Sequence, residues 1–232
     1  MKKQTPNQQL KTALLSQVAS GQRTAEDAFR LIKLLDDGSG VTGEPLDIAV
    51  VGMAGRFPQA ANIREFWANL RNGIDSVDTV PAARWQAEDF YDPDPRAPGK
   101  SYCVKGGCID DADCFDPLFF NISPKEAELM DPQQRLFLEE AWHAFEDAGY
   151  SPQALDGMKC GVFVGCGAGD YQYRLKDAGL ASESYAMMGQ SSSILAARIA
   201  YFLNLNGPCL SIDTACSSSL VAIDQACQGL RN

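Results

Sequence analysis

The sequence predicts an α/β domain preceded by a short helical hairpin. Three short apolar runs, at residues 48–53, 160–165 and 209–213, have the composition of buried strands. Amphipathic segments of helical length alternate with them, an order typical of the α/β class. A chain of 232 residues, 45% of them hydrophobic, is long enough to bury one sizeable core.

Residues 1–44 differ in pattern from the rest of the chain. Two apolar stripes recur there at helical spacing: Leu10, Leu14 and Val18, then Ala25, Ala28, Phe29, Ile32 and Leu35. Gly21 can end the first helix, Thr24 can cap the second, and residues 36–40 are expected to form a flexible linker. Two short helices bury little surface alone. The segment is therefore either a structural cap on the main domain or a linker that docks another polypeptide, and we favour docking.

The main domain, residues 45–232, is expected to begin with the strand at 48–53. A helix should follow at 62–70, with one side formed by Phe66, Trp67 and Leu70. Residues 75–116 show little periodicity and many prolines, glycines and aspartates. Loops of that length are usually functional or packed down on the domain.

The rest of the domain alternates between helices and strands. A long amphipathic helix is expected at 132–148, before the strand at 160–165. A helix at 192–203 should separate that strand from the one at 209–213. The last predicted helix, at 220–230, has an expected core face formed by Leu220, Ile223, Cys227 and Leu230.

Charge and composition exclude several classes of protein. The formal net charge is −10, which argues against nucleic acid as a partner, because such binding draws most of its affinity from Lys and Arg. No apolar run is long enough to span a bilayer. The basic N-terminus has no apolar segment behind it, so it is not a secretory signal. The sequence thus predicts a cytoplasmic protein with neither a membrane nor a nucleic-acid partner.

The eight cysteines are expected to be reduced and to bind no metal. In a chain without a secretory signal, cysteines within apolar strings such as residues 208–210 behave as small hydrophobes. Cys103, Cys108 and Cys114 are spaced too widely for a zinc knuckle, and the only histidine is distant in sequence.

Cys216 is the candidate nucleophile. A buried strand should stop at Asp213, a tight turn of small residues follows, and Cys216 then opens a helix. A thiol at a helix N-terminus meets free backbone N–H groups and the positive end of the helix dipole, which favour the thiolate. The small neighbours let a bulky thioester approach, and the Cys216 N–H can point at a developing oxyanion. The alternative is that Cys216 simply packs, as Cys209 and Cys227 are expected to do.

Several motifs resemble the ketosynthase (β-ketoacyl synthase) domains of modular polyketide synthases. Residues 213–220, DTACSSSL, are similar to the active-site signature of that family. Further similar motifs stand at 48–58 (IAVVGMAGRFP), 116–127 (DPLFFNISPKEA), 130–135 (MDPQQR) and 161–165 (GVFVG). The resemblance covers residues 46–232, and residues 1–44 resemble the helical linkers that precede such domains.

This resemblance implies a fold and a reaction. The fold would be thiolase-like, usually homodimeric, and this chain would supply its N-terminal half, layered α/β/α. Cys216 would accept an acyl chain from the phosphopantetheine arm of an acyl carrier protein, and the chain would bind no cofactor directly. A malonyl-type extender would then be decarboxylated, and its carbanion would attack the Cys216 thioester to give a β-ketoacyl thioester.

Family members take two histidines and a lysine from their second half, and this chain is expected to lack them. Its one histidine, His143, stands in the helix at 132–148 where the family usually has an acidic residue, so it is not expected to be the catalytic base. The sequence stops just where the second half would follow. We therefore expect a truncated acyltransferase that is inactive alone.

Other polar clusters are expected to be structural. Asp131, Gln134 and Arg135 stand together at a helix start, where aspartate and proline commonly begin a helix. Ser217, Ser218 and Ser219 are expected to satisfy backbone N–H groups rather than act as nucleophiles.

Two other functions compete with the condensing enzyme. The chain could be a non-catalytic half-domain or interaction module that docks an upstream synthase subunit through residues 1–44. It could also be another enzyme with a cysteine nucleophile, such as a thiolase or a cysteine hydrolase. The motif at 213–220 argues against the latter, and no partner histidine stands at a plausible position.

Overall fold

The computed structural model describes residues 6–21, 23–24, 27–28, 31–32 and 48–231, and the chain divides into two compact units at residues 48 and 49. In the first unit, α1 spans Pro6–Ala19, as predicted. The chain turns at Gly21, whose φ of 72° is left-handed and suits glycine. Thr24 Oγ1 accepts the N–H of Asp27 at 3.2 Å and so caps a helical turn. The linker expected at 36–40 lies outside the described residues.

The second unit carries the remaining helices and strands. In chain order they are α3 (Ile63–Asn72), β1 (Asp78–Thr79), α4 (Ala87–Phe90), β2 (Lys105–Gly106), α5 (Pro124–Leu129), α6 (Pro132–Asp147), α7 (Pro152–Leu155), β3 (Val162–Gly165), α8 (Tyr171–Asp177), α9 (Ala186–Gln190), α10 (Ser192–Phe202), β4 (Cys209–Ile212), the 3-10 helix η1 (Ala215–Ser217) and α11 (Ser218–Arg231). None of the helices in the described part of the chain has the length and apolarity needed to cross a bilayer.

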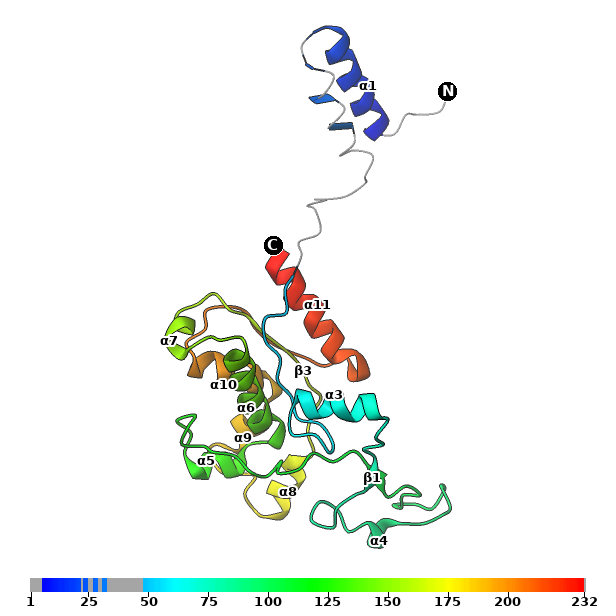
Figure 1. Cartoon of the computed structure of the whole chain (residues 1–232), viewed down its shortest axis with the longest axis vertical. Helices are drawn as coiled ribbons and strands as arrows, with labels where there is room; N and C mark the ends of the chain where they lie inside the picture. Colours follow the sequence, from blue (N-terminus) through cyan, green and yellow to red (C-terminus); the bar gives the residue numbers. More distant parts are fainter. Residues whose placement is uncertain (1–5, 22, 25–26, 29–30, 33–47, 232) are drawn as a thin grey trace. The chain divides into compact units, whose positions relative to one another are not determined.

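A parallel pair of strands lies at the centre of this unit. β3 pairs with β4 in the register Val162 to Cys209 and Gly165 to Ile212. α10 packs on β4 and α11 packs on β3, and Figure 1 shows β3 between α11 and the pair α6 and α10. A parallel pair needs a crossover connection, which here carries α8, α9 and α10. The predicted layers of helix, strand and helix are therefore present.

The core fills the space between the strands, α6 and α10. Met130, Leu138, Leu155 and Ile199 are almost fully buried there, and burying each such side chain contributes about 1.5–3 kcal/mol. An aromatic cluster adjoins it. Phe119 meets Trp142 edge-on with ring centroids 4.9 Å apart. The cluster ties the loop before α5 to α6, so the long helix is anchored along much of its length.

The predicted helix starts are confirmed for α3 and α6. The Asn62 side chain accepts the N–H groups of Arg64 and Glu65, which begins α3. Asp131 caps α6 by accepting the N–H of Gln133, and Pro132 occupies the first helical position. Both ends follow from residue types that satisfy otherwise unpaired backbone donors.

The prediction of a strand at 48–53 is wrong. This segment has no regular secondary structure, and three of its apolar side chains are exposed: Val50, Val51 and Met53. No described strand pairs with it, so its backbone forms no ladder. Its β-branched composition is compatible with an extended backbone but cannot supply the partner strand that a sheet requires.

The segment instead runs against α6. A Cβ at Gly52 would lie 2.4 Å from the Ala144 carbonyl oxygen, so the backbone and the helix are in close contact there. The Met53 N–H donates to Asp147 Oδ2 at 2.9 Å. Further along, Arg56 forms ion pairs with two adjacent carboxylates of α6, Glu139 and Glu140. Partly buried ion pairs of this kind hold the segment in place against α6, because little water screens the attraction between their charges.

The core face predicted for the last helix is also wrong. Leu220, Ile223 and Leu230 are 74%, 60% and 65% exposed. The buried residues of α11 are instead the small ones, Ser218 and Ala222. α11 approaches β3 too closely for large side chains, and only small residues fit between them.

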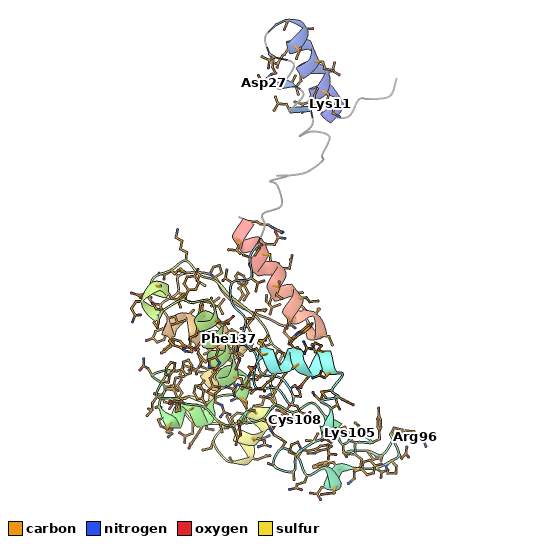
Figure 2. All side chains as sticks on the ribbon, viewed as in Figure 1. Lys11, Asp27, Arg96, Lys105, Cys108 and Phe137 are labelled. Carbon is orange, nitrogen blue, oxygen red and sulfur yellow. The ribbon has the colours of Figure 1, made fainter. Side chains whose placement is uncertain are left out.

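The long segment 75–116 projects from the body around the short antiparallel pair β1 and β2. Figure 2 shows Arg96 and Lys105 on this projection, away from Phe137 on α6. Within the segment, Arg84 Nη2 donates to the Ile109 carbonyl at 2.7 Å, and Arg174 Nη2 of α8 ties the segment to the body by donating to the Arg84 carbonyl at 3.2 Å.

Candidate functional site

Cys216 lies in a tight turn between β4 and α11. β4 ends at Ile212, and the single 3-10 turn η1 leads into the helix. Ala215 has a φ of 54°, in the left-handed region, where a non-glycine residue is strained by about 1–3 kcal/mol. Such a conformation persists only where neighbouring contacts hold it, and it reverses the chain directly before the thiol.

Hydrogen bonds to side chains hold this turn. The Ala215 N–H donates to Asp213 Oδ1 at 3.0 Å. Ser218 Oγ accepts the Thr214 N–H at 2.8 Å and donates to the Ala215 carbonyl at 2.7 Å. Ser218 is buried, so these bonds are shielded from water. Ser218 thus satisfies a backbone N–H group, as predicted for the serines of this segment.

The Cys216 residue is exposed, together with Ala215, Ser217 and Ser219. Its backbone N–H makes no hydrogen bond to another residue in the described part of the chain, whereas those of Thr214, Ala215 and Ser217 do. The turn therefore exposes the residue that carries the thiol, and the Cys216 N–H has no acceptor among the described residues. Cys209, which was expected to pack, is exposed as well, and Cys227 is half-buried.

A close backbone contact fixes the start of α11. A Cβ at Gly165, the last residue of β3, would lie 2.5 Å from the Ser218 carbonyl carbon and the Ser219 nitrogen. Only glycine permits this approach. The end of β3 therefore packs against the start of α11 and supports the turn. The small residues around Cys216 allow this close packing and also leave the thiol accessible.

The thiols of Cys160 and Cys166 have raised pKa values. Burial raises the pKa of Cys166, which directly follows β3; Ser211 opposes this shift through a hydrogen bond, and nearby carboxylates reinforce it. Burial also raises the pKa of Cys160, with a smaller contribution from Cys209. A raised pKa leaves less thiolate at neutral pH, so both thiols are poor nucleophiles there.

The structure does not bring His143 to Cys216. The His143 side chain is about half exposed, and its Nδ1 lies 3.6 Å from Glu140 Oε1. It lines a cavity of about 400 Å³ with residues of α3, α6 and the segment 53–55, and no residue of the Cys216 turn contributes to that cavity. In the described residues no group of three side chains is arranged to hold a metal ion.

Gln134 forms part of a buried polar network that the sequence did not reveal. Its Nε2 donates to the carbonyls of Met188 and Ser191 at 3.0 Å, and its Oε1 accepts Arg198 Nε at 2.7 Å. Arg198 also pairs with Glu126 at 2.8 Å. The network joins α5, α6 and α10, which agrees with the structural role predicted for Gln134. The sequence signal that could have indicated this network is the presence of Gln134 and Arg198 within otherwise apolar helical stripes.

Comparison with known proteins assigns this fold to one class. The model of the family described as "Beta-ketoacyl synthase, N-terminal domain" matches residues 46–232. The Streptomyces albus JA3453 oxazolomycin ketosynthase domain OzmH KS7 is 47% identical, covers 78% of this chain and has a TM-score of 0.74. A cysteine-to-serine variant of the ketosynthase from module 6 of the Bacillus subtilis 168 bacillaene synthase is 48% identical, covers 79% and has a TM-score of 0.71. The chain therefore has the thiolase-like fold of ketosynthases.

The sequence relatives narrow the class to polyketide synthases. Polyketide synthase PksL of Bacillus subtilis (strain 168) is 50% identical over 185 residues, or 80% of this chain, and ThaG of Burkholderia thailandensis is 46% identical over 184 residues, or 79%. The chain belongs to the β-ketoacyl synthase family. It spans only 4% and 3% of those two relatives and about 30% of the solved ketosynthase chains.

Proposed function

We propose that this chain carries the acyl-accepting part of a polyketide synthase ketosynthase, with Cys216 as its nucleophile. The observation that carries the proposal is the exposed thiol on a strained, hydrogen-bonded turn between the strand β4 and the helix α11. Such a strand–turn–helix presents a nucleophile while the scaffold beneath it stays rigid. The family match over residues 46–232 supports the same assignment.

The proposed first step is acyl transfer. The Cys216 thiolate attacks the carbonyl carbon of an acyl thioester on the phosphopantetheine arm of an acyl carrier protein. The carrier thiolate leaves and takes up a proton, and the acyl group stays on the Cys216 sulfur. The unoccupied N–H of Cys216 is suited to stabilise the oxyanion of the tetrahedral intermediate.

The proposed second step is decarboxylative condensation. A malonyl-type extender on a carrier protein loses carbon dioxide, and the resulting carbanion attacks the carbonyl of the Cys216 thioester. The carbon–sulfur bond breaks, Cys216 returns as thiolate, and a β-ketoacyl thioester leaves on the carrier. By family resemblance, two histidines and a lysine outside this chain support this step, in a protein that acts as a homodimer.

Acyl loading tests the nucleophile directly. The chain is incubated with an acyl thioester, and adducts are mapped by mass spectrometry. We expect a single adduct on Cys216, which Cys216→Ala abolishes while the circular dichroism spectrum is unchanged. Cys209→Ala is the matched control, because Cys209 is exposed but lies outside the turn, and it should load normally. An adduct that maps to another cysteine would contradict the assignment.

A second role, docking to an upstream synthase subunit, is proposed for residues 1–44. Two observations favour it. These residues fall in a compact unit distinct from the ketosynthase unit, and Leu10 and Leu15 on α1 are 51% and 58% exposed. Apolar residues exposed on a short helix are available to pack against a second polypeptide.

A further inference from the structure

Three arginines outside the Cys216 turn line one cavity. The cavity has a volume of about 660 Å³ and is bounded by the starts of α6 and α8 and by the segments around residues 84 and 113. Arg84, Arg135 and Arg174 all belong to its lining, together with Gln133 and Tyr171. These arginines come from three segments far apart in sequence, so only the fold brings the three residues to one cavity.

Each of these guanidinium groups is held by a backbone carbonyl. Arg84 Nη2 donates to Ile109 at 2.7 Å, and Arg174 Nη2 donates to Arg84 at 3.2 Å. Arg135 Nη1 donates to Asp113 at 3.4 Å, and its guanidinium lies 5.8 Å from the centre of the Tyr171 ring. A guanidinium has five N–H donors, so each arginine is positioned by one bond and keeps donors for a ligand.

Arg135, which lines the cavity, also has a buried donor that is unsatisfied. Its Nε is buried and has no hydrogen-bond partner among the described residues. A buried donor without an acceptor is costly, and native structures rarely keep one without a reason.

The carboxylates of the same cavity form no ion pair with the arginines. Asp113, Asp131 and Asp170 also line it, yet within the described part of the chain none of the three arginines forms an ion pair. Asp131 is occupied in capping α6, because its Oδ1 accepts the Gln133 N–H at 2.8 Å. Asp113 and Asp170 are exposed, so water screens their charge.

We propose that this cavity binds a phosphate group, either as free phosphate or as a phosphate ester. A tetrahedral dianion accepts several hydrogen bonds at once, and the planar fork of arginine matches its oxygen spacing. As a site for free phosphate it goes beyond the acyl-transfer function; as a site for the phosphate ester of the phosphopantetheine arm it rests on that proposed function and deepens it.

Calorimetric titration tests the site in the full chain carrying Cys216→Ala, which removes acyl chemistry from the measurement. The probes are inorganic phosphate, phosphopantetheine and pantetheine. Arg84→Gln and Arg174→Gln change exposed residues and should fold normally, and each should weaken phosphate binding by about tenfold, the effect of losing one hydrogen bond between charged groups. Arg71→Gln, which removes an exposed charge from α3 outside the cavity, is the matched control and should bind like the parent.

The outcomes separate the two sources of phosphate. Equal affinity for inorganic phosphate and phosphopantetheine supports a site for free phosphate. Tighter binding of phosphopantetheine than of either phosphate or pantetheine supports a phosphate ester. The absence of saturable phosphate binding, or equal affinities in the parent, Arg84→Gln and Arg174→Gln, overturns the proposal. Neither result affects acyl loading of Cys216, which is measured separately.

Discussion

Cys166 and Cys216 lie on neighbouring segments but differ in solvation. The Cys166 N–H donates to the carbonyl of Ile212, the last residue of β4, so Cys166 sits beside the segment that leads into the Cys216 turn. Cys166 is partly buried, and burial raises the pKa of its thiol. Cys216 is exposed on the turn itself. Of the two thiols at this end of the strand pair, we therefore expect Cys216 to be the more reactive toward electrophiles.

Competitive alkylation should label Cys216 first among the eight cysteines at neutral pH. A raised pKa means that the thiol form of Cys166 persists to higher pH, so its labelling rate should still climb above pH ~8.5, the ordinary thiol pKa. Peptide mapping after short exposure to iodoacetamide, repeated across pH, measures both rates. Faster labelling of Cys166 than of Cys216 at neutral pH would count against the nucleophile assignment.

Residue types predict the chemistry of the turn better than its conformation. Asp213, Cys216 and the serines indicate a strand followed by a helix start. The left-handed φ of Ala215 was not predictable, because alanine has no preference for that region. It follows from contacts around it, namely the Asp213 and Ser218 hydrogen bonds. Local strain at a site depends on tertiary contacts that a sequence pattern does not encode.

At the scale of elements, the contact between β3 and α11 positions the site. Gly165→Ala would place a methyl group 2.5 Å from backbone atoms of Ser218 and Ser219, which cannot rotate away. We expect it to destabilise the fold by about 1–3 kcal/mol, the usual cost of overpacking, and to slow acylation of Cys216 because the turn shifts. Denaturant unfolding and the rate of acyl loading measure the two effects.

Gly167→Ala is the matched control for that substitution. Its Cβ would meet only Asp213 Oδ2, at an ordinary contact distance of 3.8 Å. It should change stability by less than about 0.5 kcal/mol. Equal effects of the two substitutions would show that the close contact between β3 and α11 is not what supports the turn.

Deletion of residues 1–44 separates the two roles considered for them. If they dock a partner, the shortened chain keeps its melting temperature but binds an upstream synthase subunit more weakly. If they are a structural cap, the melting temperature falls and binding is unchanged. We expect the first result, because these residues fall in a compact unit distinct from the ketosynthase unit. Differential scanning fluorimetry and a pull-down with the upstream subunit give the two readouts.

Elements with local signals were predictable, and elements that depend on distant partners were not. The helices α3, α6 and α10 and the strands β3 and β4 follow from periodicity and capping residues. The segment 48–53 has strand composition but no partner strand among the described residues. The face of α11 was mispredicted because hydrophobicity alone favours its large residues, whereas the close approach to Gly165 selects its small ones.

At the scale of the whole molecule, large apolar side chains remain on the surface. Leu220, Ile223 and Leu230 line the outer side of α11, and Val50 and Val51 are exposed on another segment. Exposed apolar surface of this kind marks an interaction site or favours aggregation. Since the chain covers about 30% of the solved ketosynthases, we propose that the rest of such a domain covers these residues. The isolated chain should accordingly be prone to aggregate.

The isolated chain should not catalyse condensation. Decarboxylation leaves an enolate whose oxygen needs hydrogen-bond donors, and each donor typically stabilises the transition state by about 2.7–4 kcal/mol. General acid–base catalysis typically accelerates such a reaction by a further factor of about 10²–10⁴. The family takes these groups from histidines, and this chain has only His143, which lines a cavity separate from the Cys216 turn. Residues 1–232 are supplied with an acyl thioester and a malonyl-carrier protein, and the β-ketoacyl product is sought by mass spectrometry. We expect acylated Cys216 without product. Product formed above a Cys216→Ala background would instead mean that a group within this chain completes the site.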